Sequence, residues 1–130
     1  MMTAQGMTTY EPFTLGTLIK NLRDLPPDTE VRGLDGMVHS YRGWYERNAT
    51  SPTGLVRTAA ELADFYQSEI GETMGGWKGG DYIISADELI YYADYGDSGP
   101  LIIGLEPVDH GGFMRSAFSP VLLTDPHYLL

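Results

Sequence analysis

The sequence predicts an α+β domain in which two helices pack against an antiparallel sheet. Two amphipathic segments each begin at a residue suited to cap a helix, and the remaining segments are rich in β-branched and aromatic residues separated by Gly, Pro and Asp. The chain has 130 residues and no Cys, so packing must stabilise it. We expect one domain over 13–106, a flexible arm over 1–12, and a C-terminal extension over 107–130 that packs on the domain or on a neighbouring subunit.

The first helix is expected to begin after Thr14, whose hydroxyl can accept a hydrogen bond from an unpaired amide of the first turn. Apolar residues then recur at the spacing of one helix face, at Leu15, Leu18, Ile19 and Leu22. The helix should end before Pro26-Pro27, because proline lacks an amide hydrogen and disfavours helical geometry in the residue before it.

A β-hairpin is expected next. Asp35-Gly36 separates the strand-like segments 31–34 and 37–40, and this residue pair suits a tight turn with positive φ. The second helix should follow at Thr58, because Thr58 and Glu61 form a capping box. This helix is expected to end at Gly71 and to bury Leu62, Phe65, Tyr66 and Ile70.

Three further strands, around 82–84, 89–95 and 101–105, predict an antiparallel meander. Tyr91 and Tyr92 occupy opposite faces of the middle strand because side chains alternate along it. With Tyr95 they form a group of three, of which at least one is expected to be exposed.

The chain is strongly acidic, with 18 Asp and Glu against 8 Lys and Arg. This balance argues against a nucleic-acid or anionic-membrane partner. The start of the chain lacks the features of a signal peptide, and no apolar run reaches the length of a membrane span, so a soluble, cytosolic protein is expected. Half of the basic residues fall between 42 and 78, at Arg42, Arg47, Arg57 and Lys78, which permits a local cationic site.

The segment 39–49 is the strongest candidate for a binding site. Three aromatic rings and two arginines lie within 41–47, and a second segment places Trp77-Lys78 between pairs of glycines. Arginine can hold a phosphate or carboxylate with two parallel hydrogen bonds, and an aromatic ring can stack on a base. Two alternatives stay open, because the arginines can form surface ion pairs and the rings can pack in a core or a subunit interface.

No enzyme signature is present in the sequence. It contains no phosphate-binding loop, dinucleotide fingerprint or HExxH, and its histidines are too far apart to predict a metal site. His39 forms an acid-base pair only if the fold brings it to Asp81 or Asp94. We therefore expect neither catalysis nor a metal or cofactor.

Four short motifs carry a family resemblance: residues 13–16, 22–27, 39–45 and 76–82. With these motifs, the chain resembles the first type of Thoeris anti-defence protein, a family of small bacteriophage proteins that sequester cyclic ADP-ribose signals. The resemblance implies a homo-oligomer in the host cytoplasm that binds an intact small cyclic nucleotide and performs no chemistry. The residues expected to bind the ligand are Tyr41, Arg42, Trp44, Tyr45, Trp77, Lys78 and Asp81.

In this interpretation Trp44, Tyr45 or Trp77 stacks on the adenine, Arg42 and Lys78 hold the pyrophosphate, and Asp81 accepts a hydrogen bond from a ribose hydroxyl.

Other functions remain open. A nucleotide-degrading enzyme would turn its ligand over, and a virion or assembly accessory protein would act through protein-protein contacts. The acidic stretch 81–110 contains seven Asp and Glu and no Lys or Arg, which is compatible with an inhibitor that mimics DNA. A solvated sheet face and its loops explain the same pattern.

Overall fold

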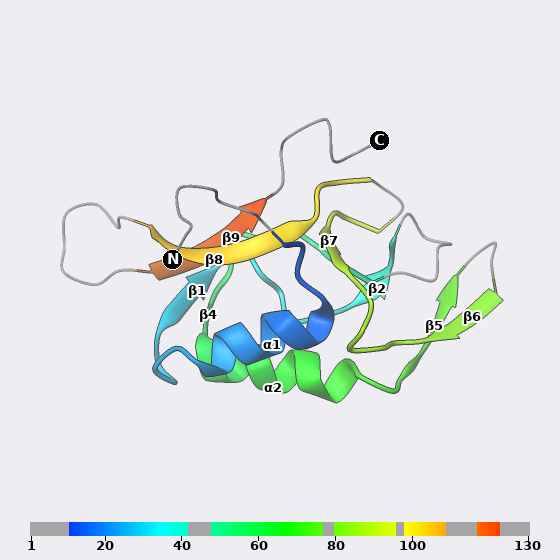
Figure 1. Cartoon of the computed structure of the whole chain (residues 1–130), viewed down its shortest axis with the longest axis horizontal. Coiled ribbons are helices and arrows are strands. Elements are labelled where there is room, and N and C mark those ends of the chain that lie inside the picture. The colour runs from blue at the N-terminus through cyan, green and yellow to red at the C-terminus, as the bar shows by residue number, and fades with distance from the viewer. Residues whose placement is uncertain (1–10, 42–47, 77–79, 96–97, 109–116, 123–130) are drawn as a thin grey trace, which may run out of the picture.

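A computed structural model describes residues 11–41, 48–76, 80–95, 98–108 and 117–122 of the chain (Figure 1). Two helices and a mostly antiparallel arrangement of strands confirm the predicted α+β class. The helices lie side by side below the largest sheet in the view of Figure 1. The main apolar core lies between these two layers.

Helix α1 spans Leu15–Arg23 and begins where the sequence predicts. The Thr14 hydroxyl accepts a hydrogen bond from the Thr17 amide at 3.0 Å, which satisfies one unpaired donor of the first turn. All four residues of the predicted apolar face are buried: Leu15, Leu18, Ile19 and Leu22.

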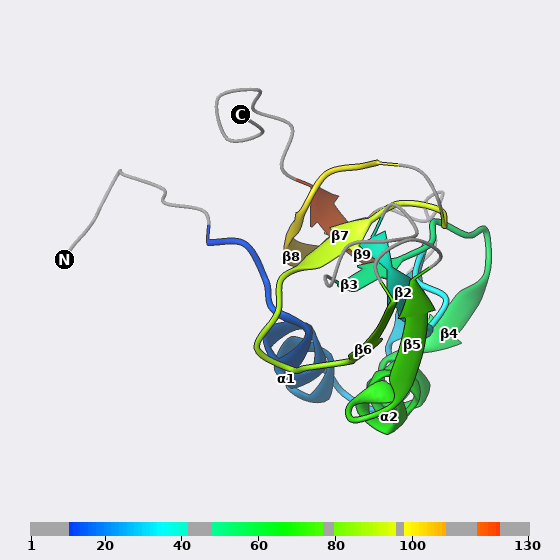
Figure 2. The same ribbon diagram turned by 90° about the vertical axis from the view of Figure 1, so that its right-hand side faces the viewer.

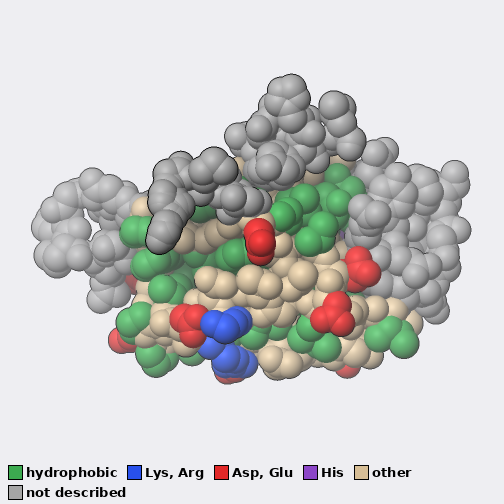
Figure 3. Space-filling view, viewed as in Figure 1, with side chains coloured by type: hydrophobic (Ala, Val, Ile, Leu, Met, Phe, Trp, Pro, Cys, Tyr) green, Lys and Arg blue, Asp and Glu red, His purple; other side chains and the backbone are tan. Residues whose placement is uncertain are grey.

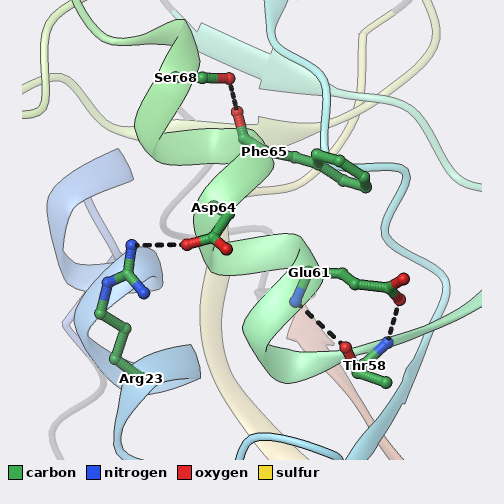
Figure 4. Close-up of polar contacts among 6 residues, drawn as sticks. All are labelled: Arg23, Thr58, Glu61, Asp64, Phe65 and Ser68. Carbon is green, nitrogen blue, oxygen red and sulfur yellow. Dashed lines mark hydrogen bonds and ion pairs between the residues drawn. The ribbon is translucent and has the colours of Figure 1, made fainter.

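Helix α2 spans Ala59–Glu69 and begins with the predicted capping box (Figure 4). The Glu61 amide donates to the Thr58 hydroxyl at 3.1 Å, and the Thr58 amide donates to the Glu61 carboxylate at 3.0 Å. Gly71, with φ of +90°, follows the end of the helix. Leu62 and Tyr66 are buried as predicted.

The predicted burial of Phe65 is wrong, because 40% of this residue is exposed. Its ring lies instead against the turn after β1 and beside the strand before α2. A Cβ atom added to Gly36 would lie 2.8 Å from Phe65, and the Arg57 guanidinium carbon lies 5.2 Å from the centre of the ring. The Phe65 side chain therefore covers the Gly36 turn at the surface, and neighbouring residues of α2 form the helix interface.

The largest sheet has four strands in the order β4-β1-β9-β8. Strand β1 (Glu30–Arg32) pairs antiparallel with β4 (Val56–Thr58) and parallel with β9 (Ala117–Leu122). Strand β8 (Ile102–Val108) pairs antiparallel with β9 and forms one edge. Residues 117–122, which the sequence assigns to a C-terminal extension, thus form an interior strand of the sheet, and position 106 falls within β8.

Two smaller sheets complete the part of the fold that the structure describes. Strands β2 (His39–Ser40), β3 (Asn48–Thr50) and β7 (Ile90–Tyr92) form one, with β2 antiparallel and β7 parallel to β3. Strands β5 (Thr73–Gly76) and β6 (Gly80–Ile83) form an antiparallel hairpin. This hairpin projects from the same end of the molecule as β2 (Figures 1 and 2).

The predicted hairpin around Asp35-Gly36 is wrong, because β1 and β2 belong to different sheets. Side-chain carboxylates here accept hydrogen bonds from backbone amides, in place of the carbonyls of a partner strand. The Asp35 carboxylate accepts from the Met37 amide at 2.9 Å, and the Glu69 carboxylate accepts from the Val38 amide at 3.0 Å. Gly36 adopts φ of +80°, so the turn itself forms, but it directs the chain into a second sheet.

The predicted three-stranded meander is also wrong. Strand β6 pairs with β5, β7 pairs with β3, and β8 pairs with β9. The segments 89–95 and 101–105 meet only at an isolated bridge between Tyr91 and Leu101. Beyond that bridge, the longer ladder with β9 determines the course of β8. Within the described residues, no helix has the length and apolar character needed to cross a membrane.

Candidate functional site

The aromatic-arginine segment connects two adjacent antiparallel strands. In the β2-β3 pair, His39 lies opposite Ala49 and Ser40 lies opposite Asn48. Residues 41–47 therefore form the connection of a hairpin, whose two ends are held side by side. Three predicted ligand-binding residues, Arg42, Trp44 and Tyr45, lie outside the residues that the structure describes.

Tyr41 is buried at the root of this connection. Its ring stacks on Tyr91 of β7, with centroids 3.9 Å apart and planes inclined by 18°. Its hydroxyl donates to the Gly99 carbonyl at 3.3 Å and lies 3.2 Å from the Gly99 amide, which donates to it. Only 9% of Tyr41 is exposed, so the structure places this predicted ligand-binding residue as an anchor of the hairpin.

Asn48 fixes the other end of the connection. Its side chain is fully buried, and its amide nitrogen donates to the carbonyls of Ser85 and Glu88 at 3.0 and 3.5 Å. The side-chain oxygen of Asn48 has no hydrogen-bond partner among the described residues. The strand that leaves the connection is thus tied to the loop before β7.

The second predicted segment, Trp77-Lys78, also belongs to a hairpin connection. Gly76 and Gly80 face each other at the last pair of the β5-β6 ladder, and residues 77–79 join them outside the described part of the chain. The backbone of Asp81 pairs with Gly75, whereas its side chain is not described. Strand β5 lies beside β2, so the two hairpins with aromatic and basic connections are neighbours (Figures 1 and 2).

His39 lies on β2 close to this site. Its Nε2 atom is 3.1 Å from the Ser51 hydroxyl, and its ring contacts Tyr95 edge-on with centroids 5.7 Å apart. Tyr95 is 52% exposed, which confirms that at least one of the three strand tyrosines faces solvent. Among the residues described, no group of three or more His, Asp or Glu side chains is positioned to hold a metal ion.

The sequence did not predict a pocket of about 330 Å³ that lies where the four-stranded sheet meets β7. Arg32, Gly33, Thr53, Tyr92 and Ser119 contribute its polar surface. These residues come from four separate parts of the chain and share no motif, so no local signal reveals the pocket.

Tyr92 supports this pocket from β7. Its hydroxyl donates to the Gly33 carbonyl at 2.6 Å. Burial raises the pKa of Tyr92, and the nearby carboxylates of Asp35 and Asp94 raise it further, since each of these effects disfavours a negative phenolate. Tyr92 is therefore neutral at physiological pH and keeps its hydrogen for Gly33.

The chain matches no protein-family model, and no curated protein or solved structure matches it either.

Proposed function

We propose that the protein binds a small cyclic nucleotide of the cyclic ADP-ribose type and sequesters it without cleavage, as a phage counter-defence protein. One structural relationship supports this most directly: the β2-β3 hairpin, anchored through Tyr41 and Tyr91, lies beside the β5-β6 hairpin. The two connections carry most of the aromatic and basic residues that the family resemblance assigns to the ligand.

The chemistry of such a ligand matches these side chains. An adenine offers a flat face on which Trp44, Tyr45 or Trp77 can stack. A pyrophosphate calls for cations, and the fork of the Arg42 guanidinium can donate two parallel hydrogen bonds to it, with Lys78 as a point charge. The Asp81 carboxylate can accept a hydrogen bond from a ribose hydroxyl.

The buried root of the first hairpin contributes by preorganisation. Ring stacking and the two hydrogen bonds to Gly99 hold Tyr41 in one place, and Asn48 is held by the carbonyls of Ser85 and Glu88. Fixing the ends of the connection reduces the conformational freedom that ligand binding must remove, so more of the contact energy is retained as affinity.

Calorimetry with cyclic ADP-ribose isomers tests the proposal. We expect titration of the wild type to give a saturable heat change. Arg42→Ala should weaken binding by at least about tenfold, since hydrogen bonds to charged groups contribute about 1.5–3 kcal/mol. Arg23→Ala is the matched control, because Arg23 lies on α1 and pairs with Asp64. No heat with any cyclic nucleotide would contradict the proposal.

A second measurement separates sequestration from catalysis. The complex is heated to denature the protein, and the released nucleotide is identified by mass spectrometry. We expect it to be recovered intact after prolonged incubation, whereas a hydrolysed or opened ring would identify an enzyme. Light scattering of the same sample tests the homo-oligomer that belongs to this proposal.

An exposed apolar surface favours a second candidate function, a virion or assembly accessory protein. Met37, Leu55, Val56 and Phe65 are 61%, 51%, 43% and 40% exposed. Met37 follows Gly36 in its turn, Leu55 directly precedes β4, Val56 begins β4, and Phe65 lies on α2 against Gly36. Such surfaces often mediate protein-protein contacts. A stoichiometric band in purified particles would favour this candidate.

The described residues give no comparable support to the DNA-mimic alternative. On the face that carries α1, acidic side chains are separated by apolar and neutral surface (Figure 3). Pull-down experiments in which the protein competes with DNA for a nuclease or repressor would be needed to support this alternative.

A further inference from the structure

The pocket at the end of β1 and beside the second half of β9 is formed by described residues from other segments than the two hairpin connections. Strands β1 and β9 run parallel, and Val31 lies opposite Phe118 in their ladder. The next residues along both strands, Arg32 and Ser119, therefore share the other face of the sheet and both line the pocket. Tyr92 closes it from the neighbouring sheet by its hydrogen bond to Gly33.

The polar groups of the pocket are mainly donors. Arg32, the one cation among its lining residues, is exposed and carries several N–H groups in a planar fork. The hydroxyls of Ser119 and Thr53 can also donate. The Tyr92 oxygen, whose hydrogen is given to Gly33, can accept from a ligand hydroxyl. This set suits a ligand that combines an anionic group with hydroxyl groups.

The remaining surface is apolar. Pro120 and Leu122 of β9 line the pocket together with Tyr92. Apolar walls with a few converging polar groups are typical of small-molecule sites, and a volume of about 330 Å³ is at the low end of their range. A ligand with one ring, whose C–H face contacts these side chains, fits this size.

Nearby carboxylates limit the charge of the ligand. Glu106 lies directly opposite Ser119 in the β8-β9 ladder, and Glu30 lies two positions before Arg32 on the same face of β1. Asp35 and Asp94 act electrostatically on Tyr92. These carboxylates repel an anion, and they repel a dianionic phosphate more strongly than a group with one negative charge. A ligand with a single carboxylate therefore meets the smaller repulsion, which its hydrogen bonds with Arg32 must outweigh.

We propose that this pocket binds a small sugar acid, a hydroxylated ring with one carboxylate, which Arg32 holds with its guanidinium fork while Ser119, Thr53 and Tyr92 bond the ring hydroxyls. This proposal does not depend on nucleotide binding at the hairpins.

Titration of the full chain with D-glucuronate tests the proposal, with D-glucose as the neutral control and glucose 6-phosphate as the dianion. We expect glucuronate to bind saturably and both other sugars to bind at least about tenfold more weakly, because one lacks the charge-assisted hydrogen bonds and the other carries excess charge. A methyl glucuronide distinguishes a free sugar acid from a uronate at the end of an oligosaccharide.

Variants locate the site. Arg32→Ala should weaken glucuronate binding by at least about tenfold, and Arg32→Lys, which keeps the charge but not the fork, should give an intermediate loss. Ser119→Ala should weaken it less. Arg23→Ala, which removes an exposed arginine elsewhere, and Arg42→Ala should leave it unchanged.

Equal binding of glucose and glucuronate, unchanged affinity in a folded Arg32→Ala protein, or no saturation with glucuronate would overturn the proposal. Loss of cyclic nucleotide binding in Arg42→Ala with retained glucuronate binding would show that the two sites are separate. Circular dichroism of each variant verifies that it is folded.

Discussion

The Tyr66 hydroxyl lies 2.9 Å from the Thr50 hydroxyl, and neither side chain has any exposed surface. Thr50 donates its only hydroxyl hydrogen to Asp35 at 2.9 Å, so Tyr66 must be the donor in the bond to Thr50. Asp35 also accepts from the Met37 amide. This chain of hydrogen bonds joins α2, β3 and the turn after β1, and it requires a protonated Tyr66.

The first prediction concerns alkaline pH. Burial raises the pKa of Tyr66 well above its usual value, and Asp35 adds to the effect, although the hydrogen bond with Thr50 opposes it. Above about pH 10 the unfolded chain loses this proton while the folded protein keeps it, so the free energy of unfolding falls by up to about 1.4 kcal/mol per pH unit. Urea unfolding from about pH 9 to pH 11 measures the slope.

Tyr66→Phe is the comparison for this prediction. The variant should have a lower free energy of unfolding at neutral pH, by about 1 kcal/mol for the lost hydrogen bond, and a shallower decline above about pH 10. Tyr92, whose pKa is also raised, contributes in the same direction and stays in both proteins. Identical alkaline slopes in the two proteins would show that Tyr66 does not govern the decline.

The second prediction concerns the start of α2. Thr58→Ala removes the hydroxyl that accepts from the Glu61 amide, and it should lower the free energy of unfolding by about 1 kcal/mol. Thr58→Ser keeps that acceptor and should cost much less. Chemical denaturation of the two variants beside the wild type measures the difference. An equal loss in both would point to the methyl group and not to the cap.

The third prediction concerns the anchor of Tyr41. A Cβ atom added to Gly99 would lie 2.2 Å from the Tyr92 carbonyl oxygen, so the backbone that holds the Tyr41 hydroxyl must shift in Gly99→Ala. We expect a loss of about 1–3 kcal/mol in unfolding free energy, as for other overpacked sites.

Gly54→Ala is the control, because a Cβ atom there would meet nothing within 4 Å. Its effect should remain within about 0.5 kcal/mol. If Gly99→Ala were as stable as Gly54→Ala, the backbone around Gly99 would be free to adjust, and the proposed rigidity of the hairpin root would lose its support.

The fourth prediction concerns the ion pair between the helices. The Arg23 guanidinium lies 3.2 Å from the Asp64 carboxylate (Figure 4), but the two side chains are 46% and 72% exposed. Solvent screens such a pair, so Arg23→Ala should lower the free energy of unfolding by less than about 1 kcal/mol. Repeating the unfolding measurement at high salt should shrink the difference. A larger, salt-insensitive loss would mean that the alkyl stem of Arg23 carries packing energy.

Both helices could be predicted because their signals are local. Thr14 and Thr58 each cap amides a few residues away, and the apolar face of α1 follows directly from the spacing of its leucines. Phe65 shows the limit of such patterns. It has the right spacing for burial, yet its ring lies at the surface against Gly36, which is distant in sequence, and near Arg57 on the strand before α2.

Local sequence patterns did not predict which strands pair with each other. The segment 31–34 has the composition of a hairpin strand, but β1 finds its partners at 56–58 and 117–118. The candidate site shows the same division. Sequence identifies the cluster at 41–47, whereas the stacking of Tyr41 on Tyr91 arises because β7 adds to β3 in parallel.

The sequence by itself determined an α+β domain, two capped helices and a concentration of aromatic and basic residues in two short segments. Only the tertiary structure decided which strands are neighbours, that Tyr41 is an anchor, and that Arg32, Ser119 and Tyr92 share a pocket. The physical reason is the range of the interactions, since caps and helix faces involve residues within one or two turns, whereas sheet pairing and pockets join segments that only the folded chain brings together.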